Sequence, residues 1–151
     1  MAFKYLPNGD VEPGIHPMLW NEFVGFFGYT AQRLYLIEGL KIALNQLYTC
    51  GCSIVYIDGS FTTLKAVPGD WDGCFDPVGI DLNRLLAQYP VFFDLVHPRA
   101  KQKFTFRGEI FPCTAIADPT TGETFLQFFQ KNKDTKSPKG IIQLTLKNYI
   151  R

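Results

Sequence analysis

The first half of the chain carries a hydrophobic pattern typical of helices. Five apolar residues recur at steps of three and four, with polar residues mostly between them: Leu36, Leu40, Ala43, Leu44 and Leu47. This spacing predicts one amphipathic helix. Thr30 is a suitable N-cap for it, and Gly51 suits the position just past its end. A shorter aromatic helix is predicted at residues 18–27, stopped by Gly28 and preceded by an extended lead-in at residues 1–17.

The second half is dominated by patterns typical of strands. Runs of β-branched or aromatic residues, and alternation of apolar with polar positions, predict strands at residues 53–58, 70–75, 104–113, 124–130 and 141–146. Asp81 is a suitable cap for a short helix between the second and third of these strands. The polar, basic segment 131–140 is interpreted as the loop of a hairpin. Helices followed by a mixed sheet predict a single α+β domain over residues 1–151, with helices at 18–51 and a sheet core at 53–146.

Composition narrows the class of protein. Apolar residues make up 46% of the 151 residues and aromatic residues 15%, which is enough for a sizeable core and excludes wholesale disorder. The net charge is +1, so any nucleic acid must be bound through a local patch. No segment has the pattern of a signal peptide or a membrane span, and we expect a cytoplasmic protein without membrane contact. The spacing of the four cysteines does not suit zinc, and we expect them to be reduced.

One stretch of the sequence carries a pattern suited to phosphate and metal chemistry. Gly59 and Ser60 directly follow the predicted strand 53–58, and Asp70 and Asp72 come ten and twelve residues after the serine. Residues two apart on a strand point to the same face, so the two aspartates can share divalent cations, and hard oxygen ligands suit Mg²⁺. A Gly-Ser turn brings backbone N–H groups close to phosphate oxygens. Lys65, inside the intervening loop, could also touch phosphates.

Simpler interpretations of these residues stay open. Asp70 and Asp72 could be turn residues after a Pro-Gly pair, and the glycine and glutamate positions of a calcium-binding EF-hand are not matched. The basic run at residues 99–103 could bind a triphosphate or a nucleic-acid acceptor, or could form an exposed charged face. The phenylalanines at residues 125–129 fit a sheet core better than a platform for stacking bases.

The Gly-Ser and Asp-x-Asp pair resembles the signature of the polymerase-β-like nucleotidyltransferase superfamily. Within that superfamily the chain is similar to a small nucleotidyltransferase-like family of bacteria and their mobile elements. The similarity includes Asp58-Gly-Ser-Phe-Thr and Pro68-x-Asp-x-Asp-Gly, followed by Gly108-Glu-Ile-Phe-Pro, Phe128-Phe-Gln and Lys139-Gly-Ile-Ile. The resemblance implies a nucleotidyltransferase-like mixed sheet packed against the N-terminal helices.

The resemblance also implies a reaction. Such proteins transfer a nucleoside monophosphate from a nucleoside triphosphate to a hydroxyl, here of a protein or RNA acceptor, using two Mg²⁺ ions held by carboxylates. Asp70 and Asp72 would be two of these metal ligands, and Gly59, Ser60 and Lys65 would hold the triphosphate. The third carboxylate is Glu109 or Asp94, and the length of the connection favours Glu109.

The resemblance leaves two classes of function open. One is an active transferase, possible in a toxin–antitoxin or phage-defence system with a partner protein from a neighbouring gene. The alternative is a catalytically inactive binding module or an antitoxin-like partner subunit, because the sequence shows no second helical domain that would grip the nucleotide base.

Overall fold

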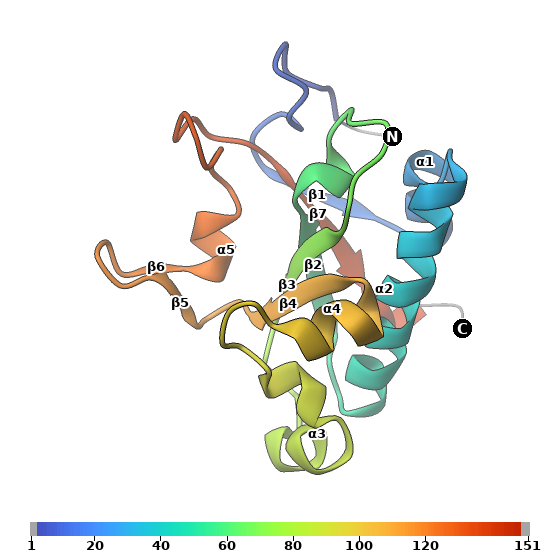
Figure 1. Cartoon of the computed structure of the whole chain (residues 1–151), viewed down its shortest axis with the longest axis vertical. Coiled ribbons are helices and arrows are strands. Elements are labelled where there is room, and N and C mark those ends of the chain that lie inside the picture. Colours follow the sequence, from blue (N-terminus) through green and yellow to red (C-terminus); the bar gives the residue numbers. More distant parts are fainter. Residues whose placement is uncertain (1–2, 149–151) are drawn as a thin grey trace.

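The computed structural model describes residues 3–148. Its central element is a mixed five-stranded sheet (Figure 1). The helices and strands are, in chain order, β1 (Ile15–Met18), α1 (Trp20–Phe27), α2 (Ala31–Thr49), β2 (Ile54–Asp58), β3 (Trp71–Phe75), α3 (Leu82–Gln88), α4 (Ala100–Phe106), β4 (Gly108–Pro112), β5 (Ile116–Asp118), β6 (Glu123–Thr124), α5 (Phe125–Phe128) and β7 (Ile141–Thr145). Short 3₁₀ helices cover Ser60–Thr62, Pro90–Phe93 and Leu146–Asn148. The strand order is β1-β7-β2-β3-β4. The α+β class is confirmed.

Strand directions place the ends of β2 and the beginnings of β3 and β4 together. β2 runs antiparallel to both of its neighbours, β7 and β3, whereas β3 and β4 are parallel and β1 is parallel to β7. The loop that leaves β2 therefore lies at the same edge of the sheet as the residues that open β3 and β4. This edge holds the candidate site.

The helices predicted from periodicity and capping are confirmed. The Thr30 side chain accepts a hydrogen bond from the backbone N–H of Arg33 at 3.1 Å and opens α2, and Gly51 follows its end with a φ of +101°. Asp81 caps α3 by accepting a hydrogen bond from the N–H of Arg84 at 3.0 Å. α1 begins at Trp20, slightly later than predicted, because residues up to Met18 pair with β7 as strand β1. The extended lead-in thus contributes an edge strand.

Two predicted strands are wrong in part. Residues 104–106 belong to α4 and only Gly108–Pro112 forms a strand, because Arg107 adopts a left-handed conformation that ends the helix. Residues 125–128 form α5, since Thr124 and Gln127 make reciprocal capping hydrogen bonds. The segment 131–140 is therefore not a hairpin loop between two long strands, but the connection from α5 to β7.

Alternation along the strands divides the sheet into two unlike faces. Val55, Ile57 and Trp71 point toward α1, α2 and α4, where the main core forms. The indole N–H of Trp71 donates to the carbonyl of Phe106 at 2.9 Å, and a Cβ on Gly39 would lie 2.1 Å from that carbonyl oxygen, so α2 and α4 pack very closely. The opposite face carries a smaller apolar cluster that includes residues of α5. In Figure 1, α5 lies on the other side of the sheet from α2.

Within the described residues, no helix has both the length and the apolar composition needed to cross a bilayer.

Candidate functional site

A row of carboxylates crosses three neighbouring strands on the face opposite α2. Asp58 of β2 is paired in register with Asp72 of β3, and Asp72 is paired with Glu109 of β4. Residues paired in register point to the same face of a sheet. Asp70 lies just before β3, and one oxygen each from Asp70, Asp72 and Glu109 lie within 4.8 Å of one another. Such a cluster of hard oxygen donors fits one or two Mg²⁺ ions.

The turn after β2 brings Gly59 and Ser60 against this row. Gly59 has a φ of +85°, and a Cβ at this position would lie 2.5 Å from the Asp72 Oδ2 atom. Both the conformation and the close approach require glycine here. Ser60 then opens the 3₁₀ helix at Ser60–Thr62. The sequence-predicted phosphate-binding residues Gly59, Ser60 and Lys65 line one cleft of about 370 Å³ together with Asp70 and Asp72.

Lysines from the segment 131–140 form another wall of this cleft. Lys139 forms an ion pair with Asp58 at 2.9 Å, and Lys131 forms one with Glu123 at 2.6 Å. Lys133 also lines the cleft and, like Lys65, forms no ion pair among the described residues. The charges of both lysines act on Asp70, lowering its pKa against the larger effect of burial. Lys65 and Lys133 are thus the cations of this cleft that remain available to a bound anion.

A buried arginine of α2 fixes the loop between β2 and β3. The Arg33 guanidinium is fully buried and donates hydrogen bonds to the carbonyls of Phe61 at 2.7 Å, Thr63 at 3.0 Å and Lys65 at 2.6 Å. It also donates to the carbonyl of Phe27 at 3.3 Å. The loop that carries the Gly-Ser turn and Lys65 is therefore tied to the main core. The sequence did not predict this role, because the helical pattern places Arg33 among the polar positions, which are expected to face solvent.

The carboxylate row is an electrostatically crowded place. Burial, followed by repulsion from Asp70, Asp58 and Glu109, raises the pKa of Asp72 to about 7. Burial also raises the pKa of Asp70, with Glu109 as the next cause, and burial raises the pKa of Asp58 despite its ion pair with Lys139. A divalent cation would relieve this repulsion, because it favours the ionised form of each carboxylate. The raised pKa values of these carboxylates thus agree with their suitability as ligands of a divalent cation.

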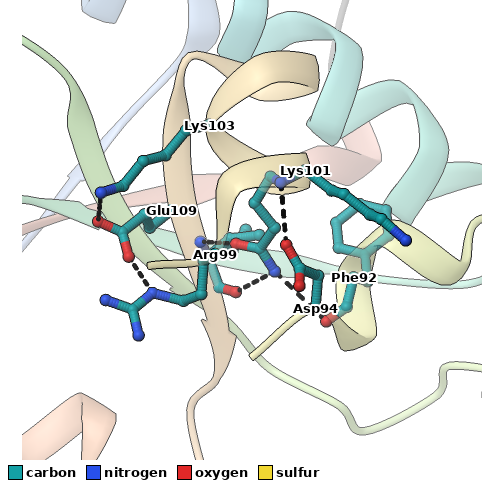
Figure 2. A network of polar contacts seen from close by, with 8 residues as sticks. Phe92, Asp94, Arg99, Lys101, Lys103 and Glu109 are labelled. Carbon is teal, nitrogen blue, oxygen red and sulfur yellow. Dashed lines mark hydrogen bonds and ion pairs between the residues drawn. The ribbon is translucent and has the colours of Figure 1, made fainter. Parts of the chain in front are cut away.

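Glu109, and not Asp94, completes the cluster. Figure 2 shows the Glu109 carboxylate between Arg99 and Lys103; it pairs with the Nε atom of Arg99 and lies 3.6 Å from the Lys103 Nζ atom. The Asp94 carboxylate instead accepts hydrogen bonds from the N–H groups of Lys101, at 3.1 Å, and of Gln102. Asp94 thus caps the first turn of α4.

The basic run at residues 99–103 does not form one continuous surface. Arg99 and Lys103 turn toward Glu109, whereas the Lys101 side chain extends away from it in Figure 2 and lines a different cleft, beside Phe104. No pattern in the sequence could have shown that two of these three cations pair with the proposed metal ligand.

Comparison with known proteins assigns the chain to a family. The model of a family of unknown function, DUF6932, matches residues 3–145, nearly the whole chain, so the chain belongs to that family. Neither the curated proteins nor the solved structures gave a match.

Proposed function

We propose that this member of the DUF6932 family is a Mg²⁺-dependent nucleotidyltransferase with a nucleotidyltransferase-like fold. The observation that carries the proposal is the meeting of Asp70, Asp72 and Glu109 beside the Gly59-Ser60 turn. Three carboxylates that can hold two metal ions, next to a glycine turn and free lysines, suit the transfer of a nucleoside monophosphate from a nucleoside triphosphate to a hydroxyl.

Each group has a part in this reaction. The Gly59-Ser60 turn, Lys65 and Lys133 would bind the β- and γ-phosphates, while Asp70, Asp72 and Glu109 would hold the metal ions. Bound Mg²⁺ would activate the attacking hydroxyl and neutralise the charge of the departing pyrophosphate. The hydroxyl oxygen forms a bond to the α-phosphorus, and the bond from that phosphorus to the bridging oxygen breaks. Pyrophosphate leaves with the electron pair, and the hydroxyl proton passes to water in the cleft.

The setting we propose is the cytoplasm, where the four buried cysteines, all free, stay reduced. A partner protein encoded by a neighbouring gene, as in toxin–antitoxin or phage-defence systems, belongs to this proposal through the sequence resemblance alone.

Labelling with each α-³²P nucleoside triphosphate, Mg²⁺ and host lysate tests the proposal. We expect labelled acceptor with the wild-type protein, and a loss of at least 100-fold in the double variant Asp70→Asn/Asp72→Asn, because the metal ligands are gone. Glu38→Gln, an exposed carboxylate of α2, is the matched control and keeps full labelling. Labelling that persists in the double variant contradicts the metal site.

A second candidate function rests on the ion pairs of Glu109. Arg99 and Lys103 neutralise this carboxylate without a metal ion, which favours an inactive binding module or antitoxin-like subunit. If that interpretation holds, the wild-type protein shows no Mg²⁺-dependent thermal shift with a nucleoside triphosphate, and Arg99→Gln gains one. A shift already present in the wild type favours the enzyme.

A further inference from the structure

A second cleft, of about 550 Å³, opens on the Glu109 side of the carboxylate row. Glu109 lines this cleft and not the first one, whereas Asp72, Phe128 and Phe129 line both. The two clefts therefore adjoin, with Asp72 at the boundary between them.

The geometry of phosphoryl transfer gives the two clefts different roles. In an in-line displacement the attacking and leaving oxygens lie on opposite sides of the phosphorus. With Gly59, Lys65 and Lys133 around the triphosphate, pyrophosphate leaves into the first cleft. The hydroxyl must then approach from the other side of the phosphorus, and the second cleft, which contains Glu109 and adjoins the first at Asp72, offers that approach. The ribose and base are joined to an equatorial oxygen, away from the line of attack.

Apolar and aromatic side chains form the walls of the second cleft. Phe111 and Phe125 stack with ring centroids 4.0 Å apart and an interplanar angle of 5°. Leu95 and Phe128 add to this surface, and Ile116 stands at its rim with 54% of its surface exposed. Such walls suit an apolar or aromatic group of the acceptor.

Cations, by contrast, are scarce in this cleft. Among the described residues that line it, Arg99 is the only cation, and its guanidinium is held by Glu109 and lies 5.2 Å from the ring centroid of Phe111. Lys101 lies in another cleft. A nucleic-acid strand carries a phosphate on every nucleotide, and proteins that bind it combine aromatic platforms with several free cations. The second cleft supplies the platform without the cations.

We propose that the second cleft binds the acceptor and that the acceptor is a polypeptide. Its apolar or aromatic side chain packs against Phe111 and Phe125, and a serine, threonine or tyrosine hydroxyl reaches Glu109. The hydroxyl oxygen becomes the phosphodiester oxygen of the nucleotidylated protein, as pyrophosphate leaves into the first cleft and the proton passes to water. This inference rests on the proposed function and names its acceptor class.

The variant Ile116→Lys separates a polypeptide from RNA by the sign of its effect. An added cation at the apolar rim weakens binding of an apolar side chain and strengthens binding of a phosphate backbone. Ile116 is exposed, so the variant keeps its fold, and Ile42→Lys, on an exposed position of α2, is the matched control. The reaction uses the full chain, Mg²⁺ and α-³²P nucleoside triphosphates, with lysate proteins or total RNA supplied separately.

We expect protease-sensitive, RNase-resistant product, reduced about five- to tenfold by Ile116→Lys and unchanged by Ile42→Lys. The dissociation constant for the Mg²⁺–nucleotide complex should stay within twofold in both variants. RNase-sensitive product, or a gain in Ile116→Lys, overturns the polypeptide in favour of RNA. If Ile116→Lys weakens binding of the nucleotide, the second cleft binds the base of the nucleotide and not the acceptor. Nucleotide binding without any labelled acceptor overturns the acceptor inference, whereas absence of metal-dependent nucleotide binding overturns the proposed function itself.

Discussion

Asp72 is the residue at which the forces in the site can be measured most directly. Its pKa of about 7 lies well above the ordinary value of 3.8, first because of burial and then because of Asp70, Asp58 and Glu109. A pKa that is higher in the folded state means that the folded protein holds the proton more tightly than the unfolded chain. The free energy of unfolding of the metal-free protein therefore falls as the pH rises from about 4 through about 7.

Replacing Asp72 with asparagine should remove most of this pH dependence. In EDTA at pH 8 we expect Asp72→Asn to be more stable than the wild type by about 2 kcal/mol, because no charge is buried among the other acids. At pH 4 the two should be nearly equal. Urea unfolding at a series of pH values measures this. If the free energy of unfolding depends on pH in the same way in both proteins, Asp72 is not the carboxylate with the raised pKa.

At the scale of single elements, the loop between β2 and β3 depends on α2. Arg33→Met should lower the free energy of unfolding by about 3 kcal/mol, because the carbonyls of Phe61, Thr63 and Lys65 lose the buried guanidinium that donates to them. Binding of the Mg²⁺–nucleotide complex should weaken as well, since Lys65 is no longer held. Urea unfolding and nucleotide titration measure the two effects. The control is Arg84→Met, an exposed position of α3. Equal losses of stability and affinity in both variants would show that Arg33 does not hold the loop between β2 and β3.

The elements that could be predicted from the sequence are those specified by nearby residues. The α2 helix follows from its apolar spacing and from Thr30, and β7 follows from its alternation. In residues 125–128, aromatic content suggested a strand, although Thr124 and Gln127 carry the spacing of a capping box. The end of α4 gave no comparable signal, because Arg107 rather than a glycine takes the left-handed conformation there.

In the candidate site, too, the sequence predicted what local spacing specifies and not the contacts between distant residues. The spacing of Gly59, Asp70 and Asp72 was visible in the sequence, and connection length favoured Glu109; the structure brings these residues together. The contacts of Arg33 and Arg99 join residues that are distant in the chain or turned by a helix, so no local pattern reveals them. The predicted strand at 124–130 gave no indication that Lys133, in the connection from α5 to β7, would line the first cleft.

At the scale of the whole molecule, segments near the two ends of the chain together build one wall of the first cleft. The side-chain amide of Asn132 donates to the buried Asp10 carboxylate at 2.9 Å, and the backbone N–H of Gly140 donates to the carbonyl of Val11 at 2.8 Å. β1 then continues this contact by pairing with β7. The lead-in segment thus holds in place the loop that supplies Lys133.

Asn132→Ala should therefore weaken nucleotide binding as well as stability. The loop loses its tie to Asp10 and its turn, in which Asn132 accepts hydrogen bonds from the N–H groups of Asp134 and Thr135. We expect the dissociation constant of the Mg²⁺–nucleotide complex to rise about five- to tenfold, because Lys133 is no longer positioned, while the free energy of unfolding falls by about 1 kcal/mol. Calorimetric titration and urea unfolding measure these quantities, with Asn83→Ala on the exposed face of α3 as the control. If affinity is unchanged while stability falls, the loop helps to hold the fold together but takes no part in binding the triphosphate. Lys65 then remains as the lysine that binds it.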